Sequence, residues 1–377
     1  MEQLNLELYN DLLNEFVEKE VKPLAKEIDE TERFPIETIE KMAKMGMLGI
    51  IVPTQYGGAG GDYNTYITAV RKLSSACATT GVILSGHMSL CVAPILEFGT
   101  EEQRRKYLPK LASGEWLGAF GLTEANAGTD AAGQQTVAVD MGDHYLLNGN
   151  KIFITNAGYA HVYIIFAMTD KKLGTKGISA FIVEADSEGF SIGKKEEKMG
   201  IRGSSTCELI FKDVRVPKEN LLGKIGEGFK VAMKTLDGGR IGIAAQALGI
   251  AEGALEESIT YVKQRKQFGK PIAAFQNTQF TLADMKVRCE AARLLVYQAV
   301  EAKESKAKDL SVKSAMAKLY AAETASFVTN RAVQLFGGYG YTREYPVERM
   351  MRDAKITEIY EGTSEVQRMV ISSTILK

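Results

Sequence analysis

The chain has 377 residues, of which 45% are apolar and 25% are charged, a balance typical of a globular protein with a large core. Its 46 basic and 47 acidic residues leave a net charge of −1, so no overall positive field attracts nucleic acid or an anionic membrane. The length favours two or three domains, and we expect no apolar run to approach the roughly 20 residues that span a bilayer.

The start of the chain and its cysteines and histidines narrow the class further. Residues 1–5 are acidic and amphipathic and resemble neither a signal peptide nor a transit peptide, which predicts a cytoplasmic protein. The four cysteines are scattered without a CxxC pair, and no two of the three histidines have the spacing of metal ligands. We therefore expect reduced thiols that serve packing, and no protein-bound metal.

Residues 1–115 predict an N-terminal helical domain. Apolar residues follow a helical period over 6–28, which Pro23 is expected to kink, and the period resumes over 36–47. A glycine-rich loop over 56–61 separates these helices from further apolar helical stretches that end near Leu111.

Residues 116–225 predict a middle β-domain of the barrel or sandwich type. Short β-rich runs occur at 136–139, 145–147, 151–155, 162–168, 178–183 and 208–211. Turn residues fill 140–143, and Asn148-Gly149 predicts a tight hairpin turn. The strands are expected to end near Pro217.

Residues 226–377 predict a C-terminal helical bundle, with helices over 229–265, 278–305, 311–336 and 364–375. Pro271 and the glycines of 337–340 separate them. The whole chain therefore reads as α, then β, then α, an α+β protein.

One carboxylate near the C-terminus has the setting of a general base. Glu361 lies between Tyr360 and Gly362, just before a helix that Thr363 or Ser364 caps. The helix N-terminus favours its ionised form, and the glycine allows a ligand to come close. Taken by itself, the same residue also fits a solvated glutamate in a loop.

Four further stretches are candidates for binding a ligand. They are a polar loop at 120–130, a strand end at 153–156, a basic segment at 265–271 with Gln276, and a glycine run at 334–341. Each also fits a purely structural interpretation without a ligand: a turn, a strand, a solvated helix end or a helix C-cap, respectively. Neither 226–228 nor 337–340 follows a strand in the manner of a Rossmann fingerprint, so we reject that interpretation of the glycines.

Together, five motifs resemble the acyl-CoA dehydrogenase family over essentially the whole chain. They are Leu-Thr-Glu at 122–124, Phe-Ile-Thr-Asn at 153–156, Arg-Lys-Gln-Phe-Gly at 265–269, Gln334 with the glycine pair at 337–338, and Tyr-Glu-Gly-Thr at 360–363. Residues 199–205 and 236–244 are most similar to the short-chain branch, the butyryl-CoA dehydrogenases. One departure is Asn126, where many relatives have proline.

The resemblance implies non-covalent FAD and a homotetramer built from dimers, with these contacts. The flavin ring would lie among Phe120, Leu122, Thr123, Phe153 and Thr155, with Thr129 near the phosphates and the substrate. The ADP half of a neighbouring subunit's FAD would contact Arg265, Gln267, Phe268, Gln276, Gln334, Gly337 and Gly338. Thr363 and Glu365 would also touch FAD, and Asp237, Arg240, Tyr360 and Gly362 would bind the acyl-CoA substrate.

The resemblance also implies a reaction. Glu361 would be the base that removes the α-proton of a short-chain acyl-CoA such as butyryl-CoA, with electrons passed to electron-transferring flavoprotein, or the reverse reduction. Some branches place the base at the position of Gly239, which cannot serve here. Acyl length would be set around Ser89, Leu90, Ile95 and Ile241. The alternatives are a medium-chain or branched-chain acyl-CoA dehydrogenase, or an acyl-CoA oxidase.

Overall fold

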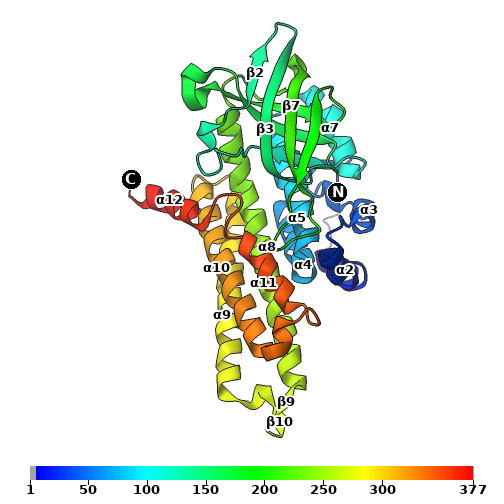
Figure 1. Cartoon of the computed structure of the whole chain (residues 1–377), viewed down its shortest axis with the longest axis vertical. Coiled ribbons are helices and arrows are strands. Elements are labelled where there is room, and N and C mark those ends of the chain that lie inside the picture. Colours follow the sequence, from blue (N-terminus) through cyan, green and yellow to red (C-terminus); the bar gives the residue numbers. More distant parts are fainter. Residues whose placement is uncertain (1–5, 377) are drawn as a thin grey trace.

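The computed structural model describes residues 6–376 and places a β-rich middle region at one end of an elongated array of helices (Figure 1). Residues 1–5, on which the expectation about targeting segments rested, lie outside the described residues. The α–β–α order predicted from the sequence is confirmed.

Seven α-helices form the N-terminal part from residue 6 onward. They are α1 (Leu6–Phe16), α2 (Ala25–Thr31), α3 (Ile36–Lys44), α4 (Tyr63–Ala76), α5 (Ala78–Ser85), α6 (Ala93–Phe98) and α7 (Glu101–Ser113). At Pro23 the predicted kink is an interruption: a π-helical turn, Val17–Val21, and a 3-10 turn, Lys22–Leu24, separate α1 from α2. Proline lacks the N–H that would continue the helix, which explains the break.

The expectation that no apolar run approaches the length of a membrane span is wrong, judged by length and composition. Ala78–Phe98 forms a continuous helical segment of 21 residues with a mean hydropathy of 1.5, long and apolar enough to cross a bilayer. About 72% of its most apolar stretch is buried inside the molecule, where the segment packs against the helix Gly228–Gln264 and the first strand. A helix in the core of a protein has this same composition, because it must be apolar all round.

The middle region is one mixed sheet of eight strands: β1 (Gly118–Gly121), β2 (Val137–Asp140), β3 (His144–Thr155), β4 (Val162–Met168), β5 (Ile178–Glu184), β6 (Phe190–Lys195), β7 (Thr206–Pro217) and β8 (Leu221–Leu222). The order is β6-β7-β3-β2-β4-β5-β8, and β1 pairs with β4 in parallel. β1, β6 and β8 were not predicted, and β8 lies beyond Pro217, where the strands were expected to end.

The two faces of the sheet serve two different cores. In β4, Ile164 and Phe166 join the large core shared with the helices, whereas Tyr163 and Ile165 join a smaller core that belongs to the sheet. Every residue of β4 is therefore buried, which explains its continuous apolar run. This shared core fixes the sheet, and the loops at its edge, on the helices.

The hairpin predicted at Asn148-Gly149 is wrong, although the turn predicted at 140–143 is confirmed between β2 and β3. Gly149 lies inside β3, where the pairing with β7 shifts register between Leu147 and Gly149. Gly149 has φ 143°, and a Cβ there would lie 2.6 Å from Oγ1 of Thr136. The glycine thus serves a β-bulge and a close approach between strands rather than a turn.

The C-terminal part contains α8 (Gly228–Gln264), α9 (Gln276–Glu304), α10 (Leu310–Phe336), α11 (Val347–Ile356) and α12 (Ser364–Ile375). The three long helices pack side by side, α11 lies against α8 and α10, and α12 lies against α10 (Figure 1). A small hairpin, β9 (Lys266–Gln267) and β10 (Lys270–Pro271), joins α8 to α9 at the end far from the sheet. The sequence did not predict α11.

Candidate active site

The turn between α11 and α12 directs the Glu361 side chain toward α8. Thr363 caps α12 by accepting from the N–H of Val366, as predicted. Glu361 has φ 53° and Gly362 has φ 90°, so the chain makes a left-handed turn just before the helix. A Cβ at Gly239 would lie 1.8 Å from Oε2 of Glu361 and 3.0 Å from Cδ2 of Leu90. The carboxylate therefore occupies the space that the missing side chain of Gly239 leaves.

Burial sets the charge state of this carboxylate. Oε2 of Glu361 is inaccessible to solvent and has no hydrogen-bond partner among the described residues. Burial raises the pKa of Glu361 to about 7, although the cations of Lys318 and Arg240 act in the opposite direction. A carboxylate with a pKa near neutrality is suited to take and return a proton.

Two predicted substrate residues lie beside it on α8. Arg240 is buried, and its Nη1 donates to Oδ1 of Asp237 at 2.8 Å. Ser311 donates to the same oxygen at 3.0 Å. The Nε of Arg240 is buried without a partner among the described residues. The pair thus has one donor without a partner within residues 6–376, buried in the residue that follows Gly239.

Tyr360 precedes Glu361 in the same turn and contacts α8. Its hydroxyl donates to Oε1 of Gln246 on α8, and Nε2 of Gln246 donates to the carbonyl of Ala78 at 3.0 Å. This series of contacts ties the turn to the buried helical segment 78–98. Among the residues expected to set acyl length, Leu90 lies beside Glu361, whereas Ile95 and Ile241 are fully buried.

The polar loop at 120–130 is held by an ion pair that sequence reasoning missed. Lys151 of β3 has no exposed side-chain surface, and its Nζ lies 2.7 Å from Oε1 of Glu124. It also donates to the carbonyl of Leu122 at 3.1 Å and to Oε1 of Gln134 at 3.0 Å. Glu124 in turn accepts from the backbone N–H of Thr136 at 3.0 Å. The cluster fixes the loop on both sides of Thr123.

The charges of this pair stabilise each other. Burial opposes ionisation of Glu124, but the Lys151 ammonium outweighs it and holds the pKa of that carboxyl below its usual range. Burial also lowers the pKa of Lys151 to about 8, despite the carboxylate beside it. Both groups are therefore charged at neutral pH, and neither tolerates loss of the other.

The strand end at 153–156 faces the same region. A second register shift in β3, between Lys151 and Ile154, leaves Phe153 at φ 59° with 60% of its surface exposed. Thr155 lies against Gly86, one helical turn before Leu90. No hydrogen bond within residues 6–376 engages the hydroxyls of Thr123, Thr129 or Thr155. Leu122 is buried, Phe120 is half-buried and Thr129 is exposed.

A second group of predicted residues gathers at the far end of the bundle. Arg265, Gln267, Gln334, Gly337 and Gly338 line one open pocket of about 510 Å³. No atom lies within 4 Å of a Cβ built at either glycine, so a ligand can approach the backbone there. Phe268 and Gln276 are exposed and do not line this pocket. Its guanidinium, amides and open backbone fit a pyrophosphate with an attached base.

The two groups cannot bind one end-to-end ligand within a single chain. Arg240 lies in the first half of α8, whereas Arg265 follows its last residue. At 1.5 Å per residue, roughly 37 Å of helix separates them, more than an extended dinucleotide spans. Thr363 and Glu365 lie at the start of α12, beside Glu361. A cofactor that needs both groups must therefore take them from two chains.

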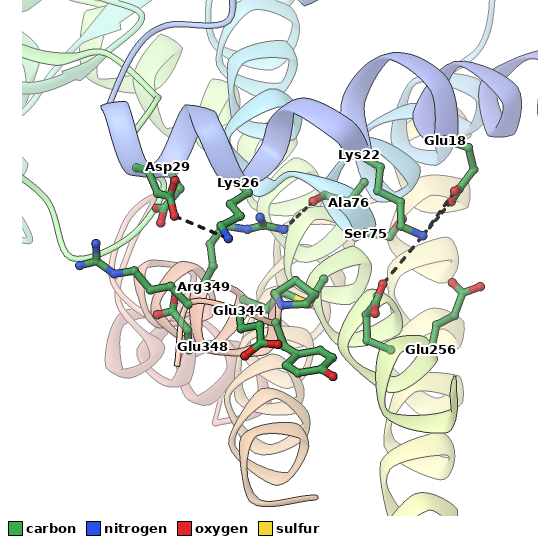
Figure 2. A pocket seen from close by; sticks show the side chains of 17 residues that line it. Glu18, Lys22, Lys26, Asp29, Ser75, Ala76, Glu256, Glu344, Glu348 and Arg349 are labelled. Atoms are coloured by element: carbon green, nitrogen blue, oxygen red, sulfur yellow. Dashed lines mark hydrogen bonds and ion pairs between the residues drawn. The ribbon is translucent and has the colours of Figure 1, made fainter. Parts of the chain in front are cut away.

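A smaller pocket of about 280 Å³ lies between α2, α4, α8 and α11. Figure 2 shows side chains of both charges around it, with Lys22 bonded to Glu18 and Arg349 bonded to the carbonyl of Ala76. It contains none of the predicted site residues. We assign it no chemistry.

Comparisons with known proteins agree along the whole chain. Residues 5–115, 119–214 and 226–376 match the families described as the N-terminal, middle and C-terminal domains of acyl-CoA dehydrogenase. A short-chain specific acyl-CoA dehydrogenase of Clostridium acetobutylicum is 62% identical over 371 residues, which cover 98% of each chain.

Two solved structures have nearly the same fold as this chain over its whole length. Butyryl-CoA dehydrogenase from Megasphaera elsdenii superposes with a TM-score of 0.97 at 53% identity, over 100% of both chains. A chain in a structure described as the electron transferring flavoprotein of Acidaminococcus fermentans superposes with a TM-score of 0.98 at 55% identity. It covers 100% of this chain and 98% of that one.

Replacing Gly239 with alanine tests the space that the carboxylate occupies. The added methyl group would collide with Oε2 of Glu361, so the side chain must move. We expect turnover to fall by roughly 100-fold, because small displacements of a reacting group have effects of that size. Steady-state kinetics measure the effect, and circular dichroism provides the control for folding. A Gly239→Ala enzyme with wild-type turnover would refute this placement.

Replacing Lys151 with methionine tests the ion pair under the polar loop. Glu124 would then be buried without its cation, and we expect the free energy of unfolding to fall by about 3–5 kcal/mol. Lys194→Met is the matched control, because the pair of Lys194 with Glu196 is exposed and should change stability by less than about 1 kcal/mol. Urea denaturation compares the two variants, and equal losses would contradict this account.

Proposed function

The chain belongs to the acyl-CoA dehydrogenase family, and from that membership we propose that it interconverts short-chain acyl-CoA thioesters such as butyryl-CoA with their α,β-unsaturated products. The observation that carries the proposal is Glu361: its Oε2 is buried without a partner among the described residues, it faces Gly239, and its pKa is raised to about 7. It is the base that removes the α-proton, or the acid that returns it in the reductive direction.

The residues present fit FAD at both groups of site residues. The free hydroxyls of Thr123 and Thr155, with exposed Phe153, suit the flavin ring. Thr129 suits the phosphates and the substrate. The open backbone at Gly337 and Gly338, with Arg265, Gln267 and Gln334, suits the ADP half, and Phe268 and Gln276 flank it. When bound, FAD supplies the acceptor for the hydride that leaves the β-carbon.

The protein must also make the α-proton acidic enough to remove. A thioester α-hydrogen is too weakly acidic for a carboxylate unless the carbonyl is polarised. The backbone N–H of Glu361 donates to no acceptor within residues 6–376, so it is available to bind that oxygen. Asp237 and Arg240 then hold the CoA chain, and Tyr360 and Gly362 line the acyl position. Closure of the site by substrate excludes water and strengthens these contacts.

The working protein is a homotetramer built from dimers, and it exchanges electrons with electron-transferring flavoprotein. The separation of the two cofactor-binding groups along α8 supports a site completed by a second chain. It is a soluble protein, and we propose that it resides in the cytoplasm. The four cysteines are buried and unbridged, which suits a reducing compartment.

Glu361→Gln is the direct test of the proposed function. The amide cannot accept the α-proton, so we expect FAD to remain bound and anaerobic reduction of the flavin by butyryl-CoA to be lost. The rate of flavin reduction in the wild-type protein is compared between butyryl-CoA and octanoyl-CoA. A faster rate with octanoyl-CoA would overturn the short-chain assignment. Reduction of the flavin in Glu361→Gln at the wild-type rate would rule out Glu361 as the base.

The same variant has a predicted effect on stability. The folded protein keeps a proton on Glu361 up to about pH 7, whereas the unfolded chain keeps it only up to about pH 4.5. The substrate-free wild-type protein therefore loses stability as the pH rises from about 4.5 to about 7. Glu361→Gln should therefore be more stable above pH 7, by up to about 3 kcal/mol, with no difference below about pH 4.

A further inference from the structure

Lys318 is a buried cation that the proposed function has not used. It lies on α10, and none of its surface is exposed. Lysine is almost never fully buried unless its charge is engaged. Its Nζ donates to the carbonyl of Gly362 at 2.7 Å, the only hydrogen bond of this ammonium within the described part of the chain. That carbonyl belongs to the residue that follows the catalytic carboxylate.

The turn that Lys318 contacts needs external support. Glu361 has φ 53°, a left-handed conformation that disfavours any residue with a Cβ. Nε2 of Gln367 donates to the carbonyl of Gly362 at 2.8 Å and to that of Glu361 at 3.3 Å. Lys318 and Gln367 thus converge on one oxygen from two helices, α10 and α12. Their hydrogen bonds hold the turn in the conformation that aims Glu361 at Gly239.

We propose that Lys318 is the positioning residue for Glu361: it fixes the turn through the carbonyl of Gly362, and its charge favours the ionised carboxylate. The inference rests on the proposed role of Glu361 as the base. Lys318 itself does not touch the substrate. It acts through the residue beside the base and through the field in which the base titrates.

The charges around Lys318 agree with this role. Burial lowers the pKa of Lys318 to about 8, and the carboxylate of Glu361 is the largest of the neighbouring charges that oppose the shift. Arg240 on α8 also lowers the pKa of Lys318, whereas Glu358 and Glu365 raise it, as Glu361 does. Glu358 is already paired with Lys355 at 2.6 Å, and Glu365 is exposed. Glu361 is therefore the buried carboxylate on which the charge of Lys318 acts most.

Two variants separate the hydrogen bond from the charge. Lys318→Met removes both, whereas Lys318→Gln keeps a donor and removes the charge. The matched control is Lys313→Met, one to two turns earlier on α10. Lys313 forms an ion pair of 3.0 Å with Asp309 and makes no contact with the turn at Gly362 among the described interactions. Each protein is purified with its flavin, and three quantities are measured. They are flavin per chain by absorbance, dehydrogenation of butyryl-CoA, and exchange of its α-protons in deuterium oxide by NMR, the last two as functions of pH.

We expect all variants to keep their flavin. In Lys318→Met, α-proton exchange should fall by at least roughly tenfold near pH 6.5, and its midpoint should move upward by about one pH unit or more, because an opposite charge close to a carboxylate has effects of that size. Lys318→Gln should show the same upward shift and retain more of its rate at high pH. Lys313→Met should match wild type.

Wild-type rate and midpoint in Lys318→Met would overturn the inference. So would loss of flavin and rate with an unchanged midpoint, which marks a merely structural role. If Lys318→Met fails to fold, an unshifted midpoint in Lys318→Gln overturns the inference and an upward shift supports it. Wild-type protein that catalyses neither exchange nor dehydrogenation would instead refute the proposed function, and the inference with it.

Discussion

The burial of one carboxylate in the space left by a glycine is the constraint on which the site depends. Gly239 has no side chain, and Glu361 fills that position from the turn before α12. Because Oε2 has neither solvent nor a protein partner among the described residues, its charged form is disfavoured, and its pKa rises to about 7. The helix N-terminus two residues later, which favours the ionised form, does not outweigh this burial.

The fold places the remaining groups around that carboxylate. The strands β4 and β5 share one face with the helical core, and Thr155 at the end of β3 lies against Gly86 of the helical segment that also carries Leu90. The Lys151–Glu124 pair holds the loop at 120–130 from inside, at the cost of two buried charges. The pocket at Arg265 lies at the C-terminal end of α8, so a ligand that needs both groups of residues must take them from two chains.

Sequence patterns predicted the elements whose signals are local. The helices α8, α9, α10 and α12 follow from periodicity, and of the two predicted caps, Thr363 and Ser364, Thr363 is the one that caps α12. The hairpin turn predicted at Asn148-Gly149 was wrong because the same dipeptide also suits a β-bulge. Only the pairing of β3 with β7 decides between a turn and a bulge. The helix α11 was missed, and the apolar length of 78–98 was underestimated. That this segment is a core helix depends on its packing against α8, far away in the sequence. Lys151 and Lys318 gave no signal, since the carbonyls that they hold are 29 and 44 residues away.

The central claim is that burial, opposed but not cancelled by the cations of Lys318 and Arg240, makes Glu361 a base that titrates near neutrality. The most direct test is the rate of anaerobic flavin reduction by butyryl-CoA in the wild-type protein, measured by stopped flow across the pH range. The account predicts a rate that rises with pH through a midpoint near 7, as Glu361 loses its proton. A rate that stays level from about pH 5.5 to about pH 8.5 would contradict it, because an ordinary carboxylate is ionised throughout that range.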